Sequence, residues 1–186
     1  MIIELFGLPA TGKTTIAKIL DRDGVLPFIK IKNAWELLFL NVLFFYKHPI
    51  VAYKILFKTL NYRDFVNFFL YRNAKYEKAT HYKKSLIDEG MFQNLLSVFK
   101  QPINQKKFLQ LAQSLPKPDL LVILETTKEE RERRINIRGI MVRQDRDYFY
   151  EEFMKILPQL NLNYLKINAD NSEATSNIIK THVANN

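Results

Sequence analysis

The sequence predicts a three-layer α/β fold built on a doubly wound, parallel, five-stranded sheet. Apolar runs of strand length alternate along the chain with stretches of helical character, the pattern of a parallel sheet covered on both faces. The clearest run, Leu120 to Leu124, is continuously apolar, as expected of a strand buried on both sides. The 186 residues are 47% hydrophobic and 25% charged, which suits a single globular domain over residues 1–186.

The first predicted strand and helix flank a phosphate-binding loop. The strand is the apolar run Ile2 to Phe6, the loop spans Gly7 to Thr14, and the helix continues from Thr15 to Leu20. The loop is a complete G-x-x-x-x-G-K-T motif, in which glycine lets the backbone turn so that successive N–H groups surround phosphate oxygens. The sequence therefore predicts a P-loop NTPase type of sheet. The expected nucleotide-binding residues are Gly7, Leu8, Pro9, Ala10, Thr11, Gly12, Lys13, Thr14 and Thr15.

Two side chains of this loop have specific expected roles. Lys13 supplies a mobile positive charge for the β- and γ-phosphates, and the hydroxyl of Thr14 can ligate Mg²⁺. We therefore predict Lys13 as a catalytic residue, Thr14 as a metal ligand, and ATP with Mg²⁺ as the cofactors. A chance glycine-rich turn is the weaker interpretation, because strand, loop and helix follow one another in the order that the motif requires.

The next part of the chain is predicted to add a second strand and a helical insertion. Pro27 to Lys32 has the length of a short strand. Residues 33–84 are expected to be mostly helical, with one break at Pro49, and aromatic side chains recur from Trp35 to Tyr82. Basic residues recur through the same stretch: Lys47, Lys54, Lys58, Arg63, Arg72 and Lys75.

This combination of aromatic and basic side chains has two interpretations. It suits a phosphorylated acceptor, because rings stack while the phosphate pairs with cations. It also suits docking on an anionic membrane surface. We expect residues 33–84 to bind the acceptor, with peripheral membrane contact as the alternative. The apolar run Leu37 to Tyr46 is interrupted by Asn41 and is shorter than the ~20 residues that a membrane-spanning helix requires.

The third predicted strand ends in two carboxylates. Ser85 to Ile87 is followed by Asp88 and Glu89, and a helix-like stretch runs from Met91 to Phe99. The carboxyl ends of strands face the ligand crevice in a doubly wound sheet. Either carboxylate could hold Mg²⁺ through water or accept a proton from an attacking hydroxyl. We predict both as catalytic residues and Asp88 as a metal ligand; capping of the following helix is the alternative.

The last elements follow the apolar strand at Leu120 to Leu124. Thr127 and Glu130 form a capping-box pattern that predicts the start of a helix. Tyr164 to Ile167 is the last predicted strand, and a final helix is expected to begin near Asp170. Together with the earlier elements, these complete the expected five strands.

An arginine-rich stretch coincides with the helix that the capping box begins. It contains Arg131, Arg133, Arg134, Arg138, Arg143 and Arg146. Arg134 and Arg138 are four residues apart on this helix and so share a face. The fixed fork of donors on arginine suits the charge that spreads over a transferring phosphoryl group. The alternative is a solvated basic helix whose arginines pair with neighbouring glutamates.

These residues together resemble the P-loop kinases of the nucleoside and nucleotide kinase group, above all thymidylate kinases and deoxynucleoside kinases. The resemblance lies in the loop Gly7 to Thr14, in the acidic strand end at Asp88 and Glu89, and in an R-x-x-x-R-G pattern that ends at Gly139. In that family the last pattern leads into a mobile lid, here about residues 139–147. The resemblance implies an ATP-dependent small-molecule kinase.

Carried over onto this chain, the resemblance assigns roles to four arginines. Arg134 resembles an arginine that packs near adenine, and Arg138 one that approaches the phosphates; Arg143 and Arg146 fall in the expected lid. We therefore predict Arg134 as a nucleotide-binding residue and Arg138, Arg143 and Arg146 as catalytic residues. The implied acceptor is a nucleoside or nucleotide. A sugar or lipid-linked saccharide is the alternative acceptor.

The sequence lacks the motifs that are typical of several other classes of nucleotide-binding protein. A GTPase-like switch would need an N-K-x-D motif, and nicotinamide or flavin enzymes a G-x-G-x-x-G motif; neither is present. The chain has 0 cysteines, which excludes disulfides and thiolate metal sites. The net charge of +9 comes without an RNA-binding or zinc-finger motif, so we expect a phosphorylated small molecule rather than nucleic acid. With no secretory signal visible, a cytoplasmic location is expected.

Overall fold

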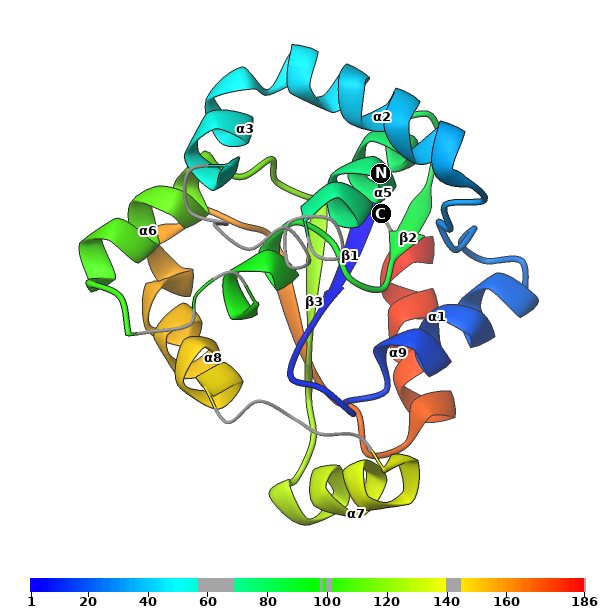
Figure 1. The fold of residues 1–186 in the computed structure, drawn as a ribbon. Coiled ribbons are helices and arrows are strands. Elements are labelled where there is room, and N and C mark those ends of the chain that lie inside the picture. The colour runs from blue at the N-terminus through cyan, green and yellow to red at the C-terminus, as the bar shows by residue number, and fades with distance from the viewer. Residues whose placement is uncertain (57–68, 98, 100–101, 140–144, 186) are drawn as a thin grey trace.

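The computed structural model describes residues 1–56, 69–97, 99, 102–139 and 145–185 (Figure 1). Within this part of the chain, four strands form one parallel sheet in the order β2-β1-β3-β4. Its members are β1 (Ile2–Phe6), β2 (Ser85–Ile87), β3 (Leu120–Glu125) and β4 (Tyr164–Asn168). All four coincide with predicted strands, and their carboxyl ends point toward the same edge of the sheet.

The expected strand at Pro27 to Lys32 does not form, so the prediction of five strands was wrong for the described residues. Phe28 makes only an isolated parallel bridge to Leu86 of β2. Leu86 N donates to Pro27 O, and Ile29 N donates to Leu86 O, each at 3.0 Å. Proline has no N–H to donate, and Phe28 N donates instead to the carboxylate of Asp21. The segment therefore pairs at a single residue beside β2.

Helices cover both faces of the sheet, as predicted (Figure 1). They are α1 (Lys13–Arg22), α2 (Ala34–Lys47), α3 (Pro49–Leu56), α5 (Tyr71–Ala79), α6 (Gln105–Ser114), α7 (Lys128–Arg138), α8 (Asp145–Ile156) and α9 (Ser172–Ala184). Two short 3₁₀ helices are η2 (Phe92–Leu96) and η3 (Leu157–Gln159). α6 and α8 have no counterpart among the predicted elements, and η2 is shorter than the helix expected from Met91 to Phe99.

Two hydrophobic clusters lie on opposite faces of the sheet. On one face Ile3 and Leu5 of β1 pack with residues of α1 and α9. On the other face Ile2 and Phe6 pack with residues of α5, α6, α8 and η2. Alternate residues of one strand serve the two clusters because side chains alternate across a sheet. Glu4 has the parity of Ile2 and Phe6 and is fully buried on their face.

The helical region expected at residues 33–84 is helical where the structure describes it. α2 packs on α5, and Asn41 Nδ2 donates to Leu70 O at 3.0 Å. Pro49 begins α3, which is the predicted break. Residues 57–68, with the predicted sites Lys58 and Arg63, lie outside the described part of the chain. No helix among the described residues is long and apolar enough to cross a membrane.

The capping predictions for the late helices were partly right. Thr127 is the N-cap of α7, and its hydroxyl accepts from Glu130 N at 3.4 Å. The carboxylate of Glu130 does not complete the box; it accepts from Arg133 and Arg134 instead. The final helix begins at Ser172, two residues after Asp170, with an asparagine as its N-cap.

Candidate active site

The phosphate-binding loop follows β1 and ends on α1. Its backbone has positive φ at Gly7 (155°), Ala10 (66°) and Gly12 (92°). A Cβ atom at Gly7 would lie 2.7 Å from Leu124 O, so the close approach of the loop to β3 requires glycine there. Gly12 is the N-cap of α1 and has no side chain to occupy the first-turn amides. The loop thus presents backbone N–H groups at a helix N-terminus, which is an anion-binding arrangement.

Lys13 lies across this loop. Its Nζ donates to Gly7 O and Leu8 O, each at 2.9 Å, and the residue is 6% exposed. Burial lowers the pKa of Lys13 to about 8, although the carboxylates of Glu89 and Asp88 act in the opposite direction. A bound polyphosphate would favour the charged ammonium again. The prediction that Lys13 belongs to the loop's ligand-binding machinery is consistent with this position.

Two side-chain hydrogen bonds hold Asp88 beside the phosphate loop. Thr14 Oγ1 donates to Asp88 Oδ2 at 2.9 Å, and Lys75 Nζ donates to Asp88 Oδ1 at 2.7 Å. Asp88 is buried. β2 delivers the carboxylate, because parallel pairing with β1 brings the carboxyl ends of both strands to one edge. The two predicted metal ligands are therefore hydrogen-bonded neighbours.

Glu89 has a different environment from Asp88. Arg72 Nη2 donates to Glu89 Oε2 at 3.1 Å, and Arg72 Nη1 donates to Asn94 Oδ1 at 2.9 Å. Burial acts to raise the pKa of Glu89, but the charges of Arg72 and Lys13 outweigh it and lower the pKa to about 2. The Glu89 side chain is still 43% exposed. It is therefore a carboxylate at neutral pH that a ligand can reach.

Gln93, which sequence analysis missed, connects η2 to the phosphate loop. Its Nε2 donates to Gly7 O at 3.1 Å, and its Oε1 accepts from Gly7 N at 3.3 Å. Gln93 is held in turn by Glu4, whose Oε1 accepts from Phe92 N at 2.8 Å and from Gln93 N at 3.2 Å. A carboxylate in the apolar run Ile2 to Phe6 was the signal in the sequence that could have indicated this contact.

The position of the Glu4 side chain also explains why a glycine follows Asp88 and Glu89. A Cβ atom at Gly90 would lie 2.5 Å from the carboxyl carbon of Glu4, so a larger residue does not fit. Glu4 Oε2 has no hydrogen-bond partner among the described residues. Burial raises the pKa of Glu4 to about 7, against the lowering effect of the backbone N–H donors and of Arg72.

Arg134 joins the phosphate loop to the loop between β4 and α9. Its Nη1 donates to Ala10 O at 3.3 Å, and its Nη2 donates to Ala169 O at 3.1 Å and Asp170 O at 2.7 Å. Its Nε donates to Glu130 at 2.7 Å. Arg134 thus holds these two loops together, and its role next to adenine stays a prediction.

The remaining arginines separate into different environments. Arg138 and Arg146 line a cavity at the phosphate loop. Arg133 pairs with Glu130 and has the surface-pair role that was the alternative. Arg131 makes two hydrogen bonds of 2.7 Å to Asp147 of α8, and its side chain is 14% exposed, so it joins α7 to α8 instead. Arg143 lies outside the described residues. Of the expected lid, residues 145–147 form the first turn of α8, and residues 140–144 are not described.

The cavity at the phosphate loop has a volume of about 180 Å³. It is lined by Pro9, Ala10, Gly12, Lys13, Thr14, Thr15, Glu89, Gln93, Arg138 and Arg146. Six of the nine predicted loop residues, the predicted acid Glu89 and two predicted arginines thus line one space, whereas Gly7, Leu8 and Thr11 are not part of its lining. Two larger hollows, lined by residues of α9 and of α6, contain no phosphate-loop residue and no carboxylate. A third, of about 240 Å³, lies against Leu8 and Thr11 on the β3 side of the loop, with Glu125 and Arg131 in its lining.

The oxygen atoms beside the loop fit Mg²⁺. The Thr14 hydroxyl and the Asp88 carboxylate are hard oxygen donors within hydrogen-bond distance of one another. Mg²⁺ is usually held by one or two protein ligands, with water and substrate phosphates completing its shell. Within the described residues, no group of three or more His, Cys, Asp or Glu forms a separate metal cluster.

No family model matches the chain, and no curated protein matches it by sequence. Its overall structure is nevertheless similar to solved structures. Deoxyadenosine kinase from M. mycoides with bound dATP aligns with a TM-score of 0.60 and 12% identity, covering 99% of this chain and 100% of that one. The YorR protein from Bacillus subtilis, in complex with phosphorylated GDP, aligns with a TM-score of 0.59 and 17% identity, covering 99% and 96%.

Thymidylate kinase from Candida albicans is a third similar structure, with a TM-score of 0.56, 14% identity, and coverage of 99% of this chain and 91% of that one. These structural similarities span almost the whole chain. At such low sequence identities they are evidence for the fold alone. The chain therefore has the P-loop nucleoside and nucleotide kinase fold, which confirms at the level of fold the resemblance found in the sequence.

Proposed function

We propose that this protein is a P-loop phosphotransferase that transfers the γ-phosphate of ATP to a nucleoside-like or nucleotide-like acceptor. The hydrogen bond from Thr14 Oγ1 to Asp88 Oδ2 carries this proposal. It brings the carboxylates at the end of β2 to the opening of the phosphate loop. Phosphoryl transfer depends on positioning and electrostatic stabilisation, and a nucleotide-binding loop next to an acceptor-side acid provides both.

The phosphate loop would bind the triphosphate. Backbone N–H groups at the start of α1 would surround the β-phosphate, and Lys13 would move from the carbonyls of Gly7 and Leu8 toward the β- and γ-phosphate oxygens. Arg134 would lie beside the adenine, at the loop that its guanidinium holds in place. Tight packing of the loop on β3 keeps these donors preorganised.

Thr14 and Asp88 would hold Mg²⁺, which when bound neutralises charge on the phosphate oxygens. Lys75 holds the other carboxylate oxygen of Asp88, and so fixes the direction in which the carboxylate faces. This use of Asp88 leaves Glu89 for the acceptor. Glu89 is ionised and lines the cavity, so it can accept a hydrogen bond from the acceptor hydroxyl.

The arginines that line the cavity would stabilise the transferring group. Arg138 and Arg146 line the same space as Lys13. Their guanidinium groups could donate to the equatorial oxygens of the γ-phosphate and restrict the entry of water. Arg143 belongs to the same proposed set, as part of a lid that closes when both substrates are bound.

An ATP-consumption screen tests this function. Purified protein with Mg²⁺ is offered pools of nucleosides, nucleotides, sugars and lipid-linked saccharides, with the Asp88→Asn variant as a parallel sample. We expect ATP consumption that needs a nucleoside or nucleotide pool and is strongly reduced in the variant at the same Mg²⁺ concentration. Activity with only the sugar or lipid-linked pools would show that the acceptor is a saccharide and not a nucleoside or nucleotide. ATP consumption without any acceptor, to the same extent in all pools, would contradict a kinase.

A further inference from the structure

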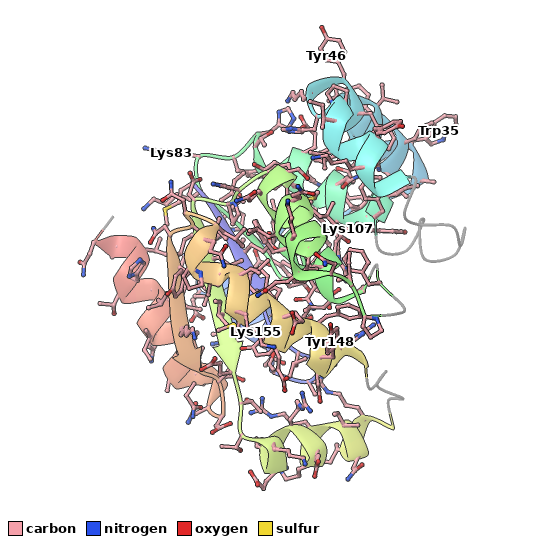
Figure 2. The ribbon with its side chains drawn as sticks, turned by 90° about the vertical axis from the view of Figure 1, so that its left-hand side faces the viewer. Trp35, Tyr46, Lys83, Lys107, Tyr148 and Lys155 are labelled. Carbon is pink, nitrogen blue, oxygen red and sulfur yellow. The ribbon has the colours of Figure 1, made fainter. Side chains whose placement is uncertain are left out.

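α2 and α3 expose a continuous set of large apolar side chains, which we call the α2–α3 apolar face. Its members are Trp35, Leu38, Phe39, Val42, Tyr46 and Ile50, with exposed fractions from 56% to 85%. The members in α2 follow helical spacing, so they lie along one side of that helix. Figure 2 shows Trp35 and Tyr46 projecting outward from the end of the molecule that α2 forms.

The opposite side of α2 is already used for packing. Leu40 and Phe44 are buried there, and the ring of Phe44 contacts Tyr76 of α5 at an edge-on angle of 86°. α2 is therefore apolar on both sides, although only one side is covered by described residues. A helix that is apolar all round is normally buried on all sides, and apolar patches of this kind mark interaction surfaces.

This face does not belong to the candidate active site. None of the residues that line the cavity at the phosphate loop comes from α2 or α3. Figure 1 shows α2 and α3 at the opposite end of the molecule from α7, which follows the carboxyl end of β3. The aromatic side chains of this face therefore cannot contact a small acceptor in that cavity, and they need another binding partner.

The charges around the face are complementary to an anionic surface. Lys32 and Lys54 are exposed at its two ends. The one acidic residue in the described residues 32–56 is Glu36, whose carboxylate accepts from Lys78 Nζ at 2.6 Å. Lys54 also lines a hollow of about 530 Å³ next to α3 together with Lys107 of α6. The lining of that hollow contains no carboxylate.

These charges favour a membrane over a second copy of the chain. A two-fold dimer through this face would bring the lysines of two copies into one interface, and the chain already has a net charge of +9. An anionic bilayer offers phosphate groups for the lysines and an apolar boundary for the rings. Tryptophan, phenylalanine and lysine on one helical surface are the combination found in interfacial helices.

We propose that the α2–α3 apolar face docks on anionic phospholipid membranes. Trp35, Phe39 and Tyr46 enter the boundary between headgroups and acyl chains, while Lys54 and Lys107 bind lipid phosphates. The docking holds the protein on the surface and leaves the phosphate loop facing away from the bilayer. It does not depend on the proposed kinase activity, because the two sites share no residue.

Trp35 is the only tryptophan of the chain, so its fluorescence reports directly on this face. The wild-type protein is mixed with vesicles of phosphatidylcholine, or of phosphatidylcholine with phosphatidylserine, at low and high salt. We expect a blue shift of Trp35 emission, quenching by brominated lipid, and flotation of the protein, all with the anionic vesicles only and all weakened by salt.

Two sets of variants assign the binding to the face. The double variant Phe39→Ser with Tyr46→Ser should lose about tenfold or more of vesicle partitioning, since each ring leaves the apolar boundary. A matched control is Ile137→Ser with Ile178→Ser, which removes exposed apolar side chains on α7 and α9 and should bind as the wild type does. Lys54→Gln with Lys107→Gln should reduce binding at low salt and weaken its salt dependence.

Three results would overturn the proposal. The first is Trp35 emission that is the same with and without anionic vesicles. The second is equal loss of partitioning in the control and in the Phe39 and Tyr46 variant. The third is a protein that is dimeric by light scattering, and that becomes monomeric in the Phe39 and Tyr46 variant, because a second copy would then cover the face. ATP consumption is not measured in any arm, so failure here is separate from failure of the proposed function.

Discussion

Gln93 and Gly7 exchange two hydrogen bonds: the side-chain amide of Gln93 donates to Gly7 O and accepts from Gly7 N. These bonds tie η2, which follows the two acids, to the first residue of the phosphate loop. η2 and the phosphate loop are therefore held in a fixed relation by Gln93, which is only 2% exposed.

Replacement of Gln93 by leucine should weaken both the fold and nucleotide binding. The variant leaves the buried N–H of Gly7 without its side-chain acceptor, although Gly7 O still accepts from Lys13 Nζ. This loss lowers the free energy of unfolding by about 1–3 kcal/mol. ATP affinity should fall as well, because the loop loses its support. Denaturant unfolding and ATP titration measure the two effects. Gln159→Leu, at an exposed glutamine of η3, is the control and should change neither.

Asp88 and Glu89 should give different kinetic defects. Asp88→Asn should raise the Mg²⁺ concentration required for half-maximal rate, because Asp88 is the proposed ligand beside Thr14. Glu89→Gln should lower kcat with little change in the Mg²⁺ requirement, because Glu89 is proposed to orient the acceptor. Rates measured over a Mg²⁺ series distinguish the two. Identical Mg²⁺ profiles for both variants would remove the division of roles.

Arg133 and Arg134 offer a matched pair for the nucleotide side. Both pair with Glu130, but only Arg134 also donates to the carbonyls of Ala10, Ala169 and Asp170. Arg134→Met should therefore weaken ATP binding by about tenfold or more, since hydrogen bonds from a charged group contribute about 1.5–3 kcal/mol. Arg133→Met should leave ATP binding unchanged. Equal affinities for the two variants would show that Arg134 is only a surface pair.

Glu4 should give stability a specific dependence on pH. Burial raises the pKa of Glu4 to about 7 from an ordinary value of 4.5, so the folded protein binds this proton more tightly than the unfolded chain does. The stabilisation is complete below about pH 4.5 and is lost as the pH rises through about 7. The loss amounts to about 3 kcal/mol, at 1.36 kcal/mol for each unit of pKa shift.

Glu4→Gln tests this dependence, because glutamine can still accept from Phe92 N and Gln93 N but does not titrate. The difference in unfolding free energy between variant and wild type should move in favour of the variant from pH 5 to pH 8. Denaturant unfolding across that range measures it, and titration of other groups cancels in the difference. A constant difference across the range would show that Glu4 stays ionised in the folded protein.

The phosphate loop and the acids were predictable because their positions follow from local rules. A G-x-x-x-x-G-K-T motif between strand and helix specifies the loop, and the carboxyl end of β2 specifies the edge where Asp88 lies. Parallel pairing then requires the two to meet. The contact between Thr14 and Asp88 therefore follows from the sequence once the sheet order is assumed.

Other features depend on contacts that local rules do not contain. The carboxylate of Glu4 accepts from the backbone N–H groups of Phe92 and Gln93, which are far along the chain. No local sequence motif therefore marks this contact. The segment at Phe28 has a strand-like pattern, but hydrogen bonding to Asp21 limits its pairing with β2. For residues 33–84, the aromatic and basic composition indicated a binding surface. Only the packing of α2 on α5 shows which of the aromatic rings remain exposed.

Transfer of labelled γ-phosphate by the wild type and by Lys13→Ala, with an acceptor found in the screen, tests the central claim most directly. The wild type should move the label to the acceptor. The variant should lose about a thousandfold or more in rate, because it lacks the cation proposed to stabilise the transferring phosphoryl group. Circular dichroism should show that the variant is folded. A folded Lys13→Ala protein that transfers phosphate at the wild-type rate would contradict the proposed function.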